Sequence, residues 1–117
     1  SFISLALVLP ALRGLMISEG PETDHCEAIV LVKPQFEVGR QRVGKGGVVR
    51  EPAAHVDAIT AVIEAACLIG WNPSGLVASP LTGPAGNHEY LLWLTSQVDQ
   101  AFTNHTIDRV VSDTLSG

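Results

Sequence analysis

Hydrophobic residues occur along this chain in short runs and in helix-spaced sets, separated by polar or glycine-rich connections. The run from Ala28 to Val32 is short and continuous, which is typical of a strand that is buried on both faces. Lys33 ends this run, and Pro34 follows at once. Because such strands present ligands and chemistry at their carboxyl ends, Lys33 is the first candidate functional residue.

Helical spacing of apolar residues predicts three helices. They cover residues 4–16, residues 51–70 and the stretch from residue 97 onward. The second is expected to begin at Pro52 and to close at Gly70, since proline favours the first turn of a helix and glycine its C-terminal cap. Residues 103–106 are expected to interrupt the third helix, and its end is expected to fray.

Two further strands are predicted at residues 75–79 and 89–94, on either side of a loop rich in glycine and proline, and they are expected to pair as an antiparallel hairpin. The order helix, strand, helix, strand, strand is what an alternating α/β domain leaves when its parallel sheet is cut near the middle. We therefore expect an α/β fold with parallel strands and a terminal hairpin. The apolar start at Ser1 suggests a fragment of a longer protein.

Charge is distributed unevenly along the chain. The net charge is -5, yet the segment from Lys33 to Arg50 holds five of the seven cations. Its glycines let a backbone approach a polyanion closely, and its cations can form charge-assisted bonds to phosphate oxygens. The candidate phosphate-binding residues are Arg40, Arg42, Lys45 and Arg50. The alternative is that this basic loop, residues 40–50, is a flexible solvated connection.

The same segment contains a partial nucleotide-binding motif. Residues 39–46 reproduce the spacing of two glycines and a lysine found in P-loops, but Gly46 stands where a hydroxyl would bind magnesium. A P-loop also runs directly into a helix, whereas Val48, Val49 and Pro52 intervene here. Nucleotide hydrolysis is therefore disfavoured.

Composition argues against several other classes. The two cysteines are too few for a disulfide framework and the four histidines show no ligand spacing, so we expect no metal and a reducing cytoplasm. The apolar stretch from Phe2 to Leu12 falls short of the ~20 residues that span a bilayer, and no cationic region precedes it. No membrane partner is expected.

Lys33 has a structural and a chemical interpretation. A lysine at a strand end can simply extend its ammonium group into water or form an ion pair. To act as a base it needs burial or cationic neighbours, because an ordinary lysine is protonated at neutral pH. Glu89, at the start of the last predicted strand, is the carboxylate best placed to reach the same sheet edge, although it can also be an exposed strand residue.

Five strings of residues point together to one family. They are Ser1 to Ser4, Leu31 to Glu37, Val43 to Arg50, Ala78 to Leu81 and Gly86 to Tyr90. These strings resemble the TlyA, or hemolysin A, family of ribosomal RNA 2′-O-methyltransferases, which have an FtsJ-like catalytic domain. The resemblance implies that residues 1–95 are the C-terminal part of that domain and that residues 96–117 form a helical tail.

The resemblance also implies a site. The family's catalytic domain is a Rossmann-like fold that binds S-adenosylmethionine, and its active site is a tetrad of Lys, Asp, Lys and Glu. Lys33 matches the second lysine, which activates the ribose hydroxyl, and Glu89 matches the glutamate that orients this lysine. The other two members and the glycine-rich cofactor loop lie upstream of Ser1 in the family, so the cofactor-binding residues of this chain are unknown. The basic loop would hold the RNA backbone.

Two functions remain open at this stage. The first is the C-terminal part of a cytoplasmic, S-adenosylmethionine-dependent enzyme that methylates ribose 2′-hydroxyls of ribosomal RNA, with ribosomal subunits as partners. The second is a truncated, inactive remnant that at most binds RNA through residues 40–50. Because the upstream half is absent, the fragment alone is expected to be inactive.

Overall fold

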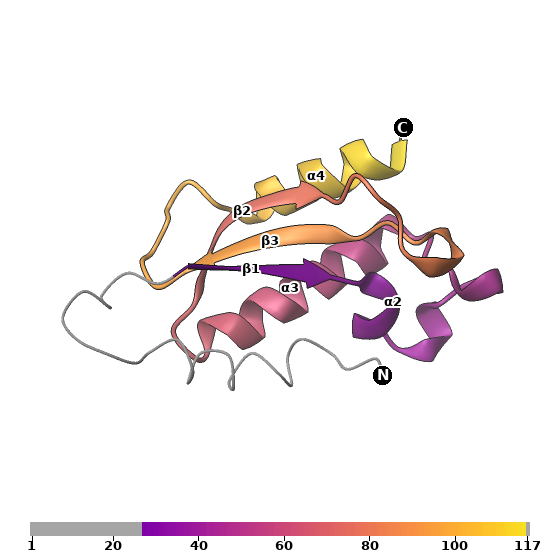
Figure 1. Ribbon diagram of the computed structural model, residues 1–117, viewed down its shortest axis with the longest axis horizontal. Coiled ribbons are helices and arrows are strands. Elements are labelled where there is room, and N and C mark those ends of the chain that lie inside the picture. The colour runs from indigo at the N-terminus through magenta and orange to yellow at the C-terminus, as the bar shows by residue number, and fades with distance from the viewer. Residues whose placement is uncertain (1–26, 117) are drawn as a thin grey trace.

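The computed structural model describes residues 27–116, so the helix predicted over residues 4–16 lies outside the described range. Within that range one sheet is formed by β1 (Glu27–Val32), β2 (Asn72–Ala78) and β3 (Tyr90–Thr95). The strand order is β1-β3-β2, and both neighbouring pairs are antiparallel (Figure 1). β1 and β2 consequently point the same way, with β3 between them.

The position of β3 corrects one prediction. The hairpin is confirmed as the ladder between β2 and β3. The predicted parallel strands are β1 and β2, but β3 lies between them, so neither ladder within residues 27–116 is a parallel one. β3 has a neighbour on each edge, and five of its six residues, YLLWLT, are apolar or aromatic, as is typical of a central strand. Local patterning shows where a strand begins and ends but not which strands flank it.

Two helices, α3 (Pro52–Cys67) and α4 (Asn104–Ser116), pack on one face of the sheet. α3 begins at the predicted proline, and beyond its end Gly70 adopts a positive φ of 91°, as expected of a glycine at a helix C-terminus. The buried residues of helices and strands form one core, which consists of Val30, Val32, Ile59, Val62, Ala66, Trp71, Leu76, Tyr90, Leu92, Leu94, Ile107 and Val111.

The last helix begins later than predicted. α4 starts inside the stretch 103–106, where the sequence predicts an interruption. The Thr103 N–H donates to Thr106 Oγ1 at 3.2 Å, and the Thr106 N–H donates to the Thr103 carbonyl at 3.0 Å. Short polar side chains that compete with helical hydrogen bonds are favoured at helix N-termini, so the same threonines start this helix. Ile107 and Val111 then anchor it in the core.

The connection from β1 to α3 is made of short turns rather than a long flexible loop. These turns are α2 (Pro34–Glu37), η2 (Arg40–Arg42) and η3 (Lys45–Gly47). Gly46 and Gly47 have positive φ values of 77° and 80°, which glycine adopts without the penalty of a Cβ atom. No long helix follows the glycines directly, so residues 39–51 do not have the geometry of a P-loop.

Candidate active site at the end of strand β1

Lys33 lies directly after β1, and its ammonium group contacts the carboxylate of Glu89, which lies directly before β3. Lys33 Nζ is 3.1 Å from both Glu89 Oε1 and Oε2. Gln35 Nε2 donates a third hydrogen bond, of 3.0 Å, to Oε2. The side chain of Glu89 is 5% exposed and that of Lys33 is 34% exposed. The pair thus combines a buried carboxylate with a lysine whose side chain is partly exposed.

The register of the sheet explains why residues 56 positions apart meet. Val32 pairs with Tyr90 in the antiparallel ladder. Lys33 follows Val32 and Glu89 precedes Tyr90, so both lie at the same edge of the sheet. Pro34 then turns the chain at once, because its fixed φ suits the first position of a helix. This turn directs Gln35, two residues after Lys33, toward the same carboxylate.

Asn87 joins the two loops that border this pair. Its Oδ1 accepts a hydrogen bond from the Val49 N–H at 2.9 Å, and its Nδ2 donates to the Gly47 carbonyl at 2.8 Å. The Asn87 carbonyl accepts from the Gly83 N–H at 2.8 Å. Since Asn87 is 1% exposed, these bonds satisfy buried groups that would be costly to leave unpaired. Asn87 thus connects the second half of the basic loop to the loop that precedes β3.

His55 holds the same loop from α3. Its Nε2 lies 2.8 Å from the Val49 carbonyl and its Nδ1 lies 2.8 Å from the Tyr90 hydroxyl. A carbonyl only accepts, so Nε2 carries the proton and the Tyr90 hydroxyl donates to Nδ1. The sequence contained a signal for this burial, because His55 stands four residues before Ile59 on the apolar side of the predicted helix.

Burial sets the protonation states of this network. It raises the pKa of Tyr90 to about 12, so the hydroxyl keeps its proton. Burial also lowers the pKa of His55; the bond to the Val49 carbonyl opposes this shift and the charge of His88 adds to it. The neutral imidazole is the form that can accept from Tyr90 while donating to the loop.

Acid is expected to weaken the fold through His55. The unfolded chain takes up a proton near the ordinary histidine pKa of about 6.5, whereas the folded chain takes it up only at lower pH. The unfolded state therefore binds more protons in that interval, and stability falls as pH drops below about 6.5. Urea unfolding at pH 7.5 and pH 5.5 measures this loss. In His55→Gln the free energy of unfolding should differ less between pH 7.5 and pH 5.5 than it does in the wild type. An unchanged difference would contradict the assignment to His55.

The four candidate phosphate-binding residues differ in whether their side chains are already bonded within the protein. Arg42 donates to Asp57 at 2.6 Å and to Glu51 at 3.0 Å, and these hydrogen bonds, with that to Asp57 the larger, raise the pKa of Arg42. Both partners lie at or near the start of α3. Arg42 is thus bound within the protein and connects η2 to that helix.

Arg50 is also engaged by the protein backbone. It donates to the carbonyls of Lys45 at 2.8 Å and Val48 at 3.5 Å. The side chains of Arg40 and Lys45 are exposed, and neither forms an ion pair within residues 27–116. Arg40 and Lys45 are accordingly the two cations of this loop that are available for an external anion.

A hollow of about 270 Å³ opens beside the Lys33 side chain. It is lined by Lys33, Gln35, Phe36, Gly47, Pro84, Ala85 and Asn87. Ala85 has a positive φ of 67°, the one such value among non-glycine residues of the described range. Backbone strain of this kind concentrates at functional sites. The Lys33 side chain thus lines this hollow together with apolar residues such as Phe36 and Pro84.

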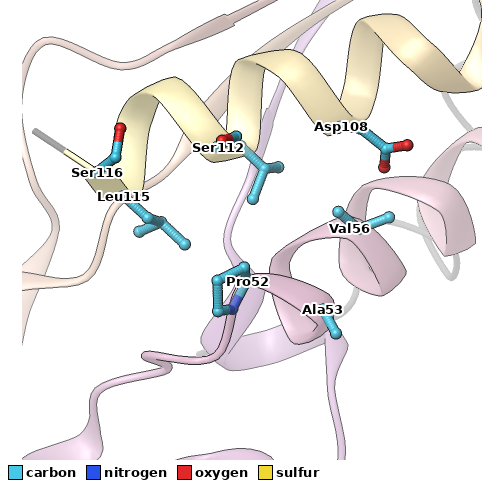
Figure 2. Close-up of a pocket in the computed structure, with 8 residues that line it drawn as sticks. Pro52, Ala53, Val56, Asp108, Ser112, Leu115 and Ser116 are labelled. Atoms are coloured by element: carbon cyan, nitrogen blue, oxygen red, sulfur yellow. The ribbon is translucent and has the colours of Figure 1, made fainter.

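A second hollow, of about 340 Å³, lies between the start of α3 and the C-terminal half of α4 (Figure 2). It shares no residue with the first. Its walls are mostly aliphatic and Asp108 is its one titratable side chain, so it offers no pair of groups for acid-base chemistry. Residues 27–116 contain no helix long and apolar enough to cross a membrane.

Comparison with known proteins shows the family to which this chain belongs. The model of the FtsJ-like methyltransferase family matches residues 4–96, and the chain therefore belongs to that family. Within it, the chain groups with the TlyA, or hemolysin A, rRNA methyltransferases. The 16S/23S rRNA (cytidine-2′-O)-methyltransferase TlyA of Mycobacterium tuberculosis is 45% identical over 116 residues, which are 99% of this chain and 41% of that protein.

Other relatives agree with this grouping. Hemolysin A of Brachyspira hyodysenteriae is 32% identical over 92 residues, which are 78% of this chain and 35% of that protein. A solved structure from Streptococcus thermophilus, named provisionally as a hemolysin, has a TM-score of 0.82 and 36% identity and covers 99% of this chain and 40% of that one. The chain thus spans about two fifths of the length of these relatives or less.

Proposed function

We propose that this chain is the C-terminal part of a cytoplasmic, S-adenosylmethionine-dependent enzyme that methylates ribose 2′-hydroxyls of ribosomal RNA. The observation that carries the proposal is the Lys33–Glu89 pair at the end of β1, beside a hollow. The direction shared by β1 and β2, with β3 antiparallel between them, is consistent with the second half of a Rossmann-like sheet. In this proposal residues 1–95 complete the catalytic domain and residues 96–117 form its tail.

Lys33 is the proposed group that activates the ribose hydroxyl: its ammonium form can stabilise charge that develops on the oxygen, and only its neutral form can accept the proton. A ribose hydroxyl is a weak acid and a poor nucleophile, so methyl transfer needs the hydroxyl aligned and its developing charge or proton taken up by a neighbouring group. The Lys33 side chain is partly exposed and lines the hollow, and we propose that its Nζ bonds to such an oxygen. Glu89 holds the ammonium group from the buried side and balances its charge, which keeps Nζ aimed at the hollow.

The hollow beside Lys33 is not assigned to the cofactor. The hollow beside Lys33 measures about 270 Å³, below the ~300–1,000 Å³ typical of pockets for ligands of this size. Asn87, which lines this hollow, already uses both its Oδ1 and its Nδ2 in hydrogen bonds to backbone groups. We therefore assign residues 27–116 to the acceptor side of the reaction and derive no step through the methyl donor.

The basic loop is the proposed contact to the RNA backbone, through Arg40 and Lys45, whose exposed side chains form no ion pair within residues 27–116. The double variant Arg40→Ala, Lys45→Ala in the full-length enzyme should weaken RNA binding and reduce the slope of log K against log salt by about 1.4, since each lost phosphate contact on a single strand contributes ~0.7. The measurement is a salt titration of RNA binding. Arg109→Ala, which removes an exposed arginine of α4, is the matched control and should leave the slope unchanged.

The competing function is a remnant that binds RNA without catalysis. Incubating ribosomal subunits with S-adenosylmethionine labelled in its methyl group, together with either the full-length enzyme or the 117-residue chain, separates the two. We expect label to be transferred to RNA by the full-length enzyme and not by the 117-residue chain. RNA binding without transfer by either protein would favour the remnant.

A further inference from the structure

The Glu89 carboxylate is held by more than its ion pair. Lys33 reaches both oxygens at 3.1 Å, and Gln35 Nε2 bonds to Oε2 at 3.0 Å. A carboxylate bound by one flexible lysine can still rotate about its last bond, because the ammonium group can follow it. A second donor on a different side chain fixes the plane of the carboxylate, and through it the position of Lys33 Nζ.

The side-chain amide of Gln35 has one hydrogen-bonded group and one unsatisfied group. An ionised carboxylate only accepts hydrogen bonds, so Nε2 must face Glu89 and Oε1 must face away. Within residues 27–116, Oε1 is buried and has no hydrogen-bond partner. A buried acceptor without a partner is unfavourable, and a leucine of similar size would avoid it. The position thus retains a donor toward Glu89 in spite of an unsatisfied oxygen.

Gly83 restricts the carboxylate from another side. A Cβ atom built on Gly83 would overlap Glu89 Oε2 and come within 2.8 Å of Glu89 Cδ. The φ of Gly83 is -76°, a value that other residues adopt, so the requirement for glycine here is one of space and not of backbone conformation. Gly83 is also fixed in place, because its N–H donates to the Asn87 carbonyl.

From these contacts we infer that Gln35 is a positioning residue of the methyl-transfer site, acting on the Lys33 ammonium group through the Glu89 carboxylate, which it seats against Gly83. The inference rests on the proposed function, since the reaction is the one proposed above. Gln35 does not bind the acceptor in this account; it fixes the angle at which Lys33 presents Nζ to it.

The first test is Gln35→Leu in the full-length enzyme, with kcat and KM measured separately on ribosomal subunits. We expect kcat to fall about tenfold or more, as for loss of one hydrogen bond to a charged group, with KM for RNA within about twofold. Gln100→Leu makes the same chemical change outside the site and should leave both constants unchanged. Unaltered kcat in Gln35→Leu would overturn the inference.

The second test distinguishes positioning from a purely structural role. In Gln35→Glu the donor becomes a carboxylate facing Glu89, and two facing carboxylates share one proton more readily as pH falls. The activity of the variant relative to wild type, measured at each pH, should therefore rise on going from pH 8 to pH 6. If this activity ratio is the same at pH 8 and pH 6, and the variant has the melting temperature of the wild type, the inference is contradicted.

Lys33→Ala run in parallel keeps the two proposals apart. If Lys33→Ala is inactive while Gln35→Leu is fully active, the positioning role fails and the proposed function stands. If Lys33→Ala is fully active, the proposed function itself fails. Gly83→Ala provides an independent arm, because the added methyl group should displace the Glu89 carboxylate and lower kcat with little change in KM.

Discussion

Lys33→Ala in the full-length enzyme should lower kcat for methyl transfer to ribosomal RNA by about 10² to 10⁴, the range that positioned acid-base groups contribute. The reason is geometric as well as chemical, since Lys33 is the one lysine among the residues that line the hollow and its Nζ is held by Glu89. Steady-state kinetics with labelled S-adenosylmethionine measure the effect. RNA binding should change little, because Arg40 and Lys45 remain.

Two controls make this result interpretable. Lys33→Arg keeps a positive charge but cannot release a proton at neutral pH, so it should remain impaired if Lys33 acts as a base. The double variant Lys33→Met, Glu89→Gln removes the unpaired buried carboxylate that a single substitution leaves behind. It should restore stability without restoring activity. Wild-type kcat in Lys33→Ala would refute the role given to this lysine.

Glu89→Gln should have the second largest effect. The amide has nearly the shape of the carboxylate but no charge, so Lys33 loses its buried counter-ion and the hydrogen bonds to a charged group that orient it. Hydrogen bonds to charged groups contribute about 1.5–3 kcal/mol, which corresponds to a fall in kcat of roughly 10- to 150-fold. The measurement is kcat on ribosomal subunits, with the melting temperature recorded for each protein.

Glu64→Gln is the matched control for this change, because Glu64 is an exposed residue of α3 outside the site. It should leave both kcat and the melting temperature as they are. If Glu89→Gln behaves like Glu64→Gln, the Lys33–Glu89 ion pair has no part in the reaction.

Patterns of neighbouring residues were sufficient to predict where β1 and α3 lie in the sequence. The continuous apolar run predicted β1 to within one residue, and Pro52 with helical spacing predicted α3. The sheet order was beyond such patterns, since it depends on β3 entering between two strands that are distant in sequence. The start of α4 was mistaken because Thr103 and Thr106 read as helix-breaking residues, when in the fold they cap the helix.

The same distinction applies to the site. The strand-end position of Lys33 and the start of the last strand at Glu89 could be read from the chain, and the fold brings their side chains together. Asn87, His55 and Gln35 act through contacts with residues that are not their helical or strand neighbours. Helical spacing indicated that His55 is buried but not that it contacts Val49 and Tyr90. No local spacing distinguishes an Asn in a turn from one that joins two loops, so the contacts of Asn87 and Gln35 could be found only from the structure.

The central claim is that Lys33 and Glu89 serve methyl transfer to a ribose hydroxyl of ribosomal RNA. The most direct test is mass spectrometry of the nucleosides released from ribosomal subunits after reaction with the full-length enzyme and with its Lys33→Ala variant. We expect a 2′-O-methylated nucleoside that appears with the wild-type enzyme and is absent with the variant. A nucleoside methylated on its base, or equal 2′-O-methylation by both proteins, would contradict it.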